Sequence, residues 1–392
     1  MDNQKHLFQL EPQAHYLNCA YMSPLLKSVE DAGIEGIIRK RNPFYIKPNH
    51  FFEIAELAKI NIGKLINSDS ENIAIIPSAS YGLSSAVVNL PLDNGNTALV
   101  VGNEFPSGYN AIKRWCDTHN KKLNIVAEPE FSETKGQDWN KSILENINKN
   151  IAVLMISSIH WTDGTIFDLE LIGQKCLEND VVFIVDGTQS VGVATIDVKL
   201  CKIDVLVCAA YKWLLGPYSI GFAYFNNRFS NGIPLEESWL NRANAKDFTK
   251  LTQYTNQYTN ASGRYNVGQY SNFILLPMLN AALEQLLTWG TENISNYCEN
   301  LAIPLIKFLQ NSSYSIEDEK YRSKHLFGIS LPITINLDLL MIAFQENNIY
   351  VSVRGKSIRV SIHLFNTSDD IKALQKILEK FDSKNTAKIK NL

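Results

Sequence analysis

The sequence has few features of proteins that bind polyanions, metals or redox partners. Its 37 basic and 40 acidic residues give a net charge of −3, so the charge balance does not favour a nucleic-acid partner. The six cysteines are scattered, without a CxxC pair or a histidine spacing typical of zinc or redox motifs. We therefore expect no metal site and a reducing compartment.

Segments for membrane insertion and targeting are also missing. No apolar run reaches the length of a membrane-spanning helix, and residues 1–21 lack the basic and then apolar layout of a signal peptide. Repeats and low-complexity tracts are absent as well. We expect a cytoplasmic protein without a membrane partner, whose 392 residues suffice for one large domain and a smaller one.

Short apolar runs rich in β-branched residues dominate the chain between residues 70 and 225. Longer amphipathic stretches separate them, which is typical of a mostly parallel sheet covered by helices on both faces. The pattern predicts the doubly wound α/β fold class. The runs are NIAIIP, TALVVG, LNIVAE, IAVLMISS, VVFIVDG, DVLVCAA and SIGFAYF.

The pattern changes after residue 290 and predicts a smaller α+β domain. A helix is expected at 293–310, short strands at 325–331 and 349–364, and a last helix at 369–381. We place a large domain at residues 1–290, a small domain at 291–382 and a flexible tail at 383–392. Residues 1–45 are expected to contribute to the small domain and to the active site.

The segment CAAYKWLLGP places Lys212 in an apolar run. Burying an ammonium group is costly unless a neighbour neutralises it. In one interpretation the methylene stem lies along the core and the charge stays in water. In the other, the nitrogen is bound covalently to a carbonyl cofactor as a Schiff base.

Residues that follow the apolar runs are the best candidates for chemistry, because open α/β sheets bind ligands beyond the carboxyl ends of their strands. Asp186 closes one run and is followed by Gln189. This aspartate fits a turn or helix cap, and it equally fits a carboxylate that keeps a proton on the ring nitrogen of pyridoxal phosphate. Asp186 lies at the end of one apolar run and Lys212 at the end of another. The two runs are consistent with neighbouring strands of the sheet.

Three other run ends give weaker signals. Ser78, Ala79 and Ser80 precede an amphipathic helix, where small residues either cap the helix or let its amides close on a phosphate. That segment is neither a Walker loop nor GxGxxG. Phe105 either stacks on a planar ring or fills a crevice, and His160 is more simply a structural histidine.

Together these motifs resemble the class V aminotransferase family of pyridoxal-phosphate enzymes, which contains cysteine desulfurases, kynureninases and isopenicillin epimerase-like proteins. The most specific part is VDGTQSVG, followed by YKWLLGP and GFAYF. The resemblance runs from YLNCAYMSP to SIRVSIHLFNTSDDI. It implies a fold-type I homodimer with a seven-stranded sheet and pyridoxal 5'-phosphate as the cofactor.

The resemblance also implies roles for single residues. Lys212 is the Schiff-base lysine and moves the α-proton, Asp186 faces the pyridine nitrogen, and Gln189 contacts the phenolic oxygen. The remaining residues expected to bind the cofactor are Ser78, Ala79, Ser80, Phe105, Thr162, Tyr211 and Gln269. Those expected to bind the substrate are Asn18, Arg354 and Arg359, although SIRVSI alone also fits a surface arginine on an edge strand.

Several positions depart from the family pattern. Tyr211 stands where several members carry a phosphate-binding histidine, and Phe105 replaces the ring-stacking histidine of the desulfurases. Phe105 can stack on the cofactor but cannot relay a proton. In RYNVGQYSN, Asn266 and Gln269 replace the acid and the threonine of a segment that reaches the neighbouring subunit's phosphate.

The segment VSVRGKSIRVS shows the largest departure. In cysteine desulfurases a long loop with the nucleophilic cysteine separates two arginine-containing segments, whereas here only residues 355–358 lie between Arg354 and Arg359. We therefore expect an aminotransferase that acts on a small amino acid. The alternatives are a cysteine or selenocysteine lyase or an epimerase without a persulfide, an inactive pyridoxal-phosphate scaffold, and a nucleotide-binding α/β protein, although the last lacks a phosphate loop.

Overall fold

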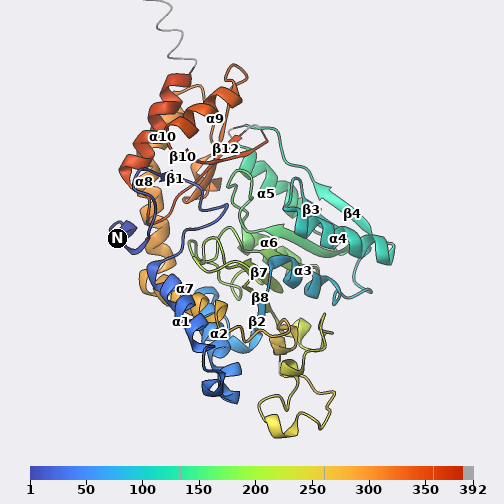
Figure 1. The fold of residues 1–392 in the computed structure, drawn as a ribbon. Coiled ribbons are helices and arrows are strands. Elements are labelled where there is room, and N and C mark those ends of the chain that lie inside the picture. Colours follow the sequence, from blue (N-terminus) through green and yellow to red (C-terminus); the bar gives the residue numbers. More distant parts are fainter. Residues whose placement is uncertain (133, 260, 356, 383–392) are drawn as a thin grey trace, which may run out of the picture.

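The computed structural model describes residues 1–132, 134–259, 261–355 and 357–382 (Figure 1). The flexible tail expected at residues 383–392 lies outside the described residues. Figure 1 shows a central sheet with helices around it, the C-terminal elements above it and the N-terminal helices below. None of the helices in the described ranges has both the length and the apolar character that crossing a bilayer requires.

All the predicted apolar runs form strands of one seven-stranded sheet. The strand β8 runs antiparallel to its two neighbours, β7 and β2, and every other neighbouring pair is parallel. The predicted doubly wound α/β class is therefore confirmed. Across the sheet the order is β2 (Ile73–Ile76), β8 (Gly221–Phe225), β7 (Val205–Ala209), β6 (Val182–Asp186), β5 (Ile151–Ser157), β3 (Thr97–Val101) and β4 (Lys122–Val126).

Helices cover both faces of this sheet because successive side chains of a strand point to opposite sides. In β2, Ile73 and Ile75 pack into one apolar cluster, and Ala74 and Ile76 pack into another. The first cluster includes side chains of α2 (Glu53–Ile66), α5 (Lys135–Asn146), α6 (Leu169–Glu178) and α7 (Leu275–Trp289). The second includes side chains of α3 (Ala79–Val87) and α4 (Pro106–His119).

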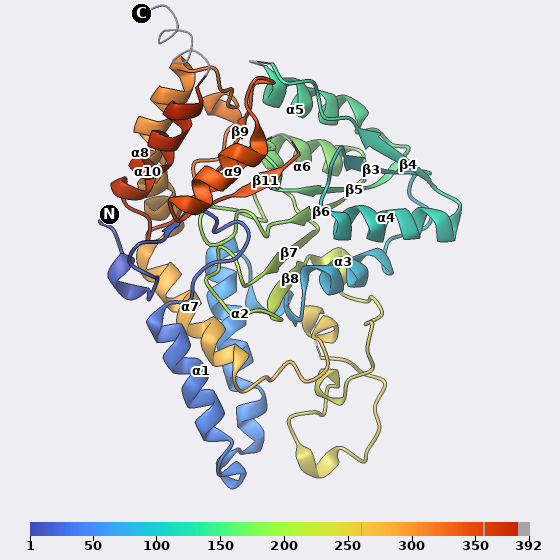
Figure 2. The same ribbon diagram turned by 45° about the horizontal axis from the view of Figure 1, so that its top comes forward.

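The C-terminal part contains a three-stranded antiparallel sheet with the order β11, β12, β9. Long helices at both ends of this segment pack against each other, as Figure 2 shows for α8 and α10. The helix α9 was not predicted from the sequence. The elements are α8 (Thr291–Asn311), β9 (Leu326–Ser330), α9 (Leu337–Glu346), β10 (Ile349–Tyr350), β11 (Ser352–Arg354), β12 (Ser357–Ser361) and α10 (Ser368–Phe381).

The N-terminal segment lies against this C-terminal part. The short strand β1 (His15–Tyr16) pairs in parallel with β10, and Asn18 forms a bridge with Ser361. Farther along the chain, α1 (Lys27–Arg39) leaves the C-terminal part and packs against α7. Residues 15–18 therefore connect the C-terminal sheet to the region around the large sheet.

Candidate active site

A cavity of about 320 Å³ lies at the carboxyl ends of the parallel strands. The strands β6 and β7 are hydrogen-bonded neighbours, with Asp186 opposite Val207. Asp186 ends β6, and the turn after β7 carries Lys212, so the predicted pair meets at one edge of the sheet. Of the predicted residues, those that line this first cavity are Ser78, Ala79, Ser80, Phe105, Asp186, Gln189, Tyr211 and Lys212.

Lys212 is buried, with 7% of its surface exposed. No carboxylate of the described residues lies within ion-pair distance of its Nζ, which is 5.7 Å from the centre of the Phe105 ring. Burial lowers the pKa of this amine to about 8, although the charge of Asp186 opposes that shift and the charge of Arg359 adds to it. The interpretation in which the charge stays in water is therefore wrong, and the cavity holds an amine that readily loses its proton.

Asp186 is buried beside this amine. Its Oδ1 accepts a hydrogen bond from the backbone N–H of Thr188 at 2.9 Å, as in an aspartate turn. Burial raises the pKa of the Asp186 carboxyl, while the hydrogen bonds of Thr188 and the charge of Lys212 act against that rise. Such a carboxylate gains from a cationic hydrogen-bond donor in the cavity.

The serines at residues 78 and 80 lie at the start of α3. Ser78 caps the helix by accepting a hydrogen bond from the Tyr81 N–H, and its Oγ lies 2.9 Å from that of Ser80. Gly82 in this first turn brings the helix against the sheet, because an added Cβ would lie only 2.8 Å from Val207 Cγ1. The segment both caps the helix and presents its N-terminal amides to the cavity, where an anion is favoured.

Phe105 and Trp161 form an aromatic pair at the mouth of the cavity. Their rings meet edge to face with 5.4 Å between centroids. The indole N–H of Trp161 donates to the Asn103 carbonyl at 2.7 Å. The buried carboxylate of Glu104 accepts hydrogen bonds from the Phe105 N–H and from Ser157, which fixes the backbone beneath the aromatic pair.

Gln189 and Tyr211 line the same cavity through different contacts. The Gln189 amide is already engaged, since its Oε1 accepts from Trp213 at 2.8 Å and its Nε2 donates to the Ala20 carbonyl at 3.3 Å. The Tyr211 ring packs against Tyr218 with 4.7 Å between centroids. The predicted contact of Gln189 with the phenolic oxygen stays a prediction.

Arg359 is almost fully buried, with 1% of its surface exposed, so the surface interpretation of this arginine is wrong. Its Nη1 donates to the Trp161 carbonyl at 2.8 Å, whereas Nε and Nη2 have no partner among the described residues. Burial, and then the charge of Arg354, lower the pKa of the guanidinium. A buried cation with free donors fits an anionic ligand. The other predicted substrate residue, Asn18, accepts a hydrogen bond from Ser352.

Five predicted residues do not line the first cavity. Thr162 and Arg354 line a second cavity, of about 560 Å³, and Trp161 lines both cavities. Asn18, Gln269 and Arg359 line neither of these two cavities. Gln269 is exposed in a turn with φ of 59°. Asn266, from the same altered segment, has a structural contact: its Oδ1 accepts from the Ile75 N–H of β2 at 2.8 Å.

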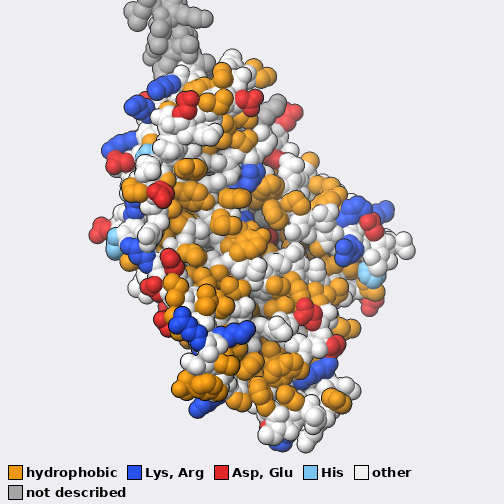
Figure 3. Space-filling model, viewed as in Figure 1, with side chains coloured by type: hydrophobic (Ala, Val, Ile, Leu, Met, Phe, Trp, Pro, Cys, Tyr) orange, Lys and Arg blue, Asp and Glu red, His pale blue; other side chains and the backbone are white. Residues whose placement is uncertain are grey.

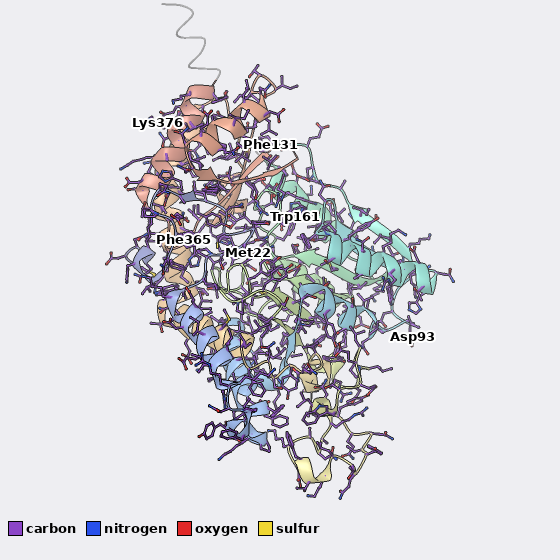
Figure 4. All side chains as sticks on the ribbon, viewed as in Figure 1. Met22, Asp93, Phe131, Trp161, Phe365 and Lys376 are labelled. Carbon is purple, nitrogen blue, oxygen red and sulfur yellow. The ribbon has the colours of Figure 1, made fainter. Side chains whose placement is uncertain are left out.

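Sequence reasoning missed several residues of the first cavity. Trp161 is the most informative, because its contacts with Phe105 and Arg359 join two distant segments. Its only signal in the sequence is its position after a predicted strand. Figure 4 shows Trp161 near the middle of the molecule, between the large sheet and the C-terminal strands. The other missed residues are Pro77, Ser107, Ser157, Thr188, Ala209, Tyr218, Ser219 and Ile220.

The first cavity fits pyridoxal phosphate by its donor set. It combines a buried amine of lowered pKa, a carboxylate on the neighbouring strand, an aromatic ring and the N-terminus of a helix. The amine suits the aldehyde of the cofactor, and the carboxylate suits its protonated ring nitrogen. The aromatic ring suits the planar pyridine ring, and the helix N-terminus suits the phosphate. Fold and cavity together define a fold-type I α/β protein.

Comparison with known proteins gives the family. The sequence profile described as "Aminotransferase class-V" matches residues 46–374, so the chain belongs to the class V aminotransferase family. An uncharacterized aminotransferase of Bacillus subtilis is 21% identical over 335 residues, which are 82% of this chain and 82% of that protein. The family implies pyridoxal phosphate as the cofactor.

Two solved structures share the fold. A cysteine desulfurase from Thermococcus onnurineus superposes with a TM-score of 0.82 at 17% identity, covering 97% of this chain and 98% of that one. The cystine C-S lyase C-DES, in complex with cysteine persulfide, superposes with a TM-score of 0.81 at 15% identity, covering 94% and 98%. These likenesses confirm the fold.

We predict that Lys212 reacts with amine reagents at lower pH than an ordinary lysine. Its pKa is lowered to about 8. At pH 8 about half of the Lys212 side chains are therefore the reactive free base, whereas less than about 1% of lysine side chains with an ordinary pKa are. In cofactor-free protein, acetic anhydride labelling of Lys212 should level off above about pH 9, while labelling of the exposed Lys113, whose pKa is raised by Asp117, continues to rise. A Lys212 profile that parallels Lys113 contradicts the assignment.

Proposed function

We propose that this protein is a pyridoxal-phosphate-dependent aminotransferase that acts on an α-amino acid. The observation that carries the proposal is Lys212, a buried amine of lowered pKa next to the strand that ends in Asp186. Arg359 is close enough to influence the Lys212 pKa and still has free donors. The site therefore offers a base and an anchor for a carboxylate.

Each of these residues has a separate task. Bound pyridoxal phosphate supplies an aldehyde that condenses with amines and a ring that accepts electron density from the α-carbon. Asp186 would hold the ring nitrogen of the bound cofactor by accepting a hydrogen bond from its N–H. Lys212 would take the proton from the substrate α-carbon and, for amino transfer, would deliver it to the aldehyde carbon of the cofactor. Arg359 orients the substrate through two parallel hydrogen bonds to its carboxylate.

The hairpin of β11 and β12 argues against a persulfide mechanism. Arg354 pairs with Ser357, so residues 355 and 356 alone join the two strands, and no long loop is present. The thiols of Cys19 and Cys208 have 0% and 1% exposure and raised pKa values because they are buried. Neither thiol is a ready nucleophile.

A lyase that expels a group from the β-carbon is the second candidate. It is favoured by the second cavity, which gives a substituent of the substrate a place beyond Trp161. The two reactions differ in their products. Amino transfer from the substrate alone gives one equivalent of 2-oxo acid per site and no free ammonium, whereas elimination gives 2-oxo acid and ammonium continuously. An epimerase would instead give only the mirror-image amino acid, and an inactive scaffold would give no product.

We predict that Lys212→Ala abolishes covalent attachment of the cofactor. After incubation with pyridoxal phosphate and borohydride, the wild-type peptide that contains Lys212 should carry the reduced cofactor mass, and the variant should carry none. Lys59→Ala is the matched control, because Lys59 is equally buried but lies on α2, outside the cavity. Stoichiometric labelling of another lysine in the Lys212→Ala protein would refute the assignment.

We predict that Arg359→Lys weakens the reaction of α-amino acids more than that of amines without a carboxylate. Lysine cannot reproduce the planar fork that binds a carboxylate through two hydrogen bonds. The expected difference is about 2–4 kcal/mol in transition-state free energy. It is measured by comparing kcat/KM for an amino acid and its decarboxylated analogue. Equal losses for both compounds would assign Arg359 a purely structural role.

We further propose that the protein is a homodimer. Exposed apolar side chains gather over the lower part of the face in Figure 3, around α1, α2 and the segment after β8. Ile37, Phe44 and Tyr254 are 59%, 72% and 96% exposed. Scattered apolar residues are ordinary on a surface, but a grouped patch favours a partner. In a dimer the exposed Gln269 would be able to contact the cofactor phosphate of the second copy. The family segment that the sequence around Gln269 resembles makes such a contact.

Light scattering should therefore give twice the mass of one chain. The double variant Ile37→Glu and Phe44→Glu should be monomeric, because the new carboxylates would be buried in the interface. Ile333→Glu is the control, since Ile333 is 97% exposed but lies in the C-terminal part. A wild-type monomer at micromolar concentration would exclude a stable homodimer.

A further inference from the structure

The second cavity lies next to the first, and Trp161 is their common wall. The Trp161 ring contacts Phe105 of the first cavity. The Arg354 guanidinium of the second cavity lies 5.4 Å from the centre of the same ring. The two cavities therefore adjoin at Trp161, and a substrate group that passed this side chain would enter the second cavity.

Part of the charge of the second cavity is neutralised by ion pairs around Lys135. The buried Lys135 forms ion pairs with Glu128, at 2.7 Å, and with Asp163. Asp163 also contacts His160, and the second oxygen of Glu128 accepts a hydrogen bond from Asn103. Lys135 is therefore neutralised by two carboxylates, and its charge also acts on Glu317.

Three other charged groups of this cavity, Glu104, Glu317 and Arg354, have no ion-pair partner among the described residues. Hydrogen bonds from Phe105 and Ser157 satisfy Glu104, whereas Glu317 and Arg354 each keep a polar atom without a partner. Glu317 is 6% exposed, and its Oε1 accepts hydrogen bonds from the N–H groups of Gly136 and Asp318. Its Oε2 is buried and has no hydrogen-bond partner among the described residues. Arg354 donates from Nη1 to the Val353 carbonyl, while its Nε has no partner in the described chain. A buried carboxylate and a guanidinium with free donors thus line one cavity.

We propose that the second cavity binds the far end of the substrate, and that this end carries both an ammonium group and a carboxylate. The substrate class is therefore an amino acid whose side chain ends in a second amino-acid head. This inference rests on the proposed function, which places the first head at Lys212 and Arg359. A ligand with one charge would pair with only one of Glu317 and Arg354 and leave the other unpaired.

The hairpin of β11 and β12 gives the two arginines separate tasks. Arg359 on β12 is opposite Ser352, whereas Arg354 is the last residue of β11 and is opposite Ser357. Arg359 donates to the backbone of Trp161, and Arg354 stacks on its ring. The two arginines thus contact different parts of Trp161, and we assign the carboxylate of one head to each of them.

A matched series of ligands tests this inference. L-Cystathionine carries both far-end charges, S-(3-carboxypropyl)-L-cysteine lacks the far ammonium, S-(3-aminopropyl)-L-cysteine lacks the far carboxylate, and S-propyl-L-cysteine lacks both. Dissociation constants are measured from the cofactor absorption band in cofactor-loaded Lys212→Ala protein, in which turnover is blocked. We expect L-cystathionine to bind about 30-fold more tightly than S-propyl-L-cysteine, and each singly charged analogue to gain less than about tenfold.

Two conservative variants assign the charges. Arg354→Gln should remove the preference for the far carboxylate, and Glu317→Gln should remove the preference for the far ammonium. The glutamine at 317 keeps an oxygen that can accept from Gly136 and Asp318, so the fold is preserved. Arg114→Gln and Glu145→Gln, at exposed positions on α4 and α5, are the controls and should retain the full 30-fold ratio.

The outcomes separate this inference from the proposed function. Equal affinity for all four ligands in the Lys212→Ala protein without a second substitution would overturn the second-head site and leave the proposed function intact. A preference for one singly charged analogue over L-cystathionine would overturn the two-charge assignment. No spectral response to any of the four amino acids would refute the proposed function, and with it this inference. The ligand series needs neither the Arg354 variant nor the Glu317 variant. It therefore still tests the inference if one of these variants fails to fold.

Discussion

The pairing of β6 with β7 is the constraint on which the site depends. Parallel neighbours end at the same edge of a sheet, so Asp186 and the turn that carries Lys212 must lie together whatever the loops do. This edge is also where α3 begins and where Phe105 follows β3. The sheet core is buried on both faces, and its rigidity lets an amine of lowered pKa face a carboxylate without collapsing onto it.

Charge is distributed unevenly around that edge. The first cavity holds a lysine of lowered pKa and lies close to a buried arginine, so it attracts anions. In the second cavity Lys135 is paired with two carboxylates, and Glu317 and Arg354 each keep a polar atom without a partner among the described residues. Trp161 separates the two environments and makes contacts to both. Trp161 thus separates a cavity that attracts anions from a cavity in which a carboxylate and a guanidinium each keep an atom without a partner among the described residues.

The sequence predicted what depends on local pattern. Each strand of the large sheet is an apolar run with its own periodicity, and the site residues at strand ends followed from the geometry of α/β sheets. The missed features depend on contacts between distant segments. Trp161 gains its position from Arg359, and Thr162 lines the second cavity instead of the first. Burial of Arg359 also depends on tertiary packing, which alternation along one strand cannot reveal.

The pairing of β1 with β10 has a consequence for folding during synthesis. His15 and Tyr16 find their partners only when residues 349 and 350 have left the ribosome, so the first segment to emerge is among the last to reach its place. Asn18 and Ser361 join at the same late stage. The large sheet can form earlier from strands that are close in sequence. The wall of the site that carries Arg359 is therefore completed last, and a nascent chain places Lys212 before it places Arg359.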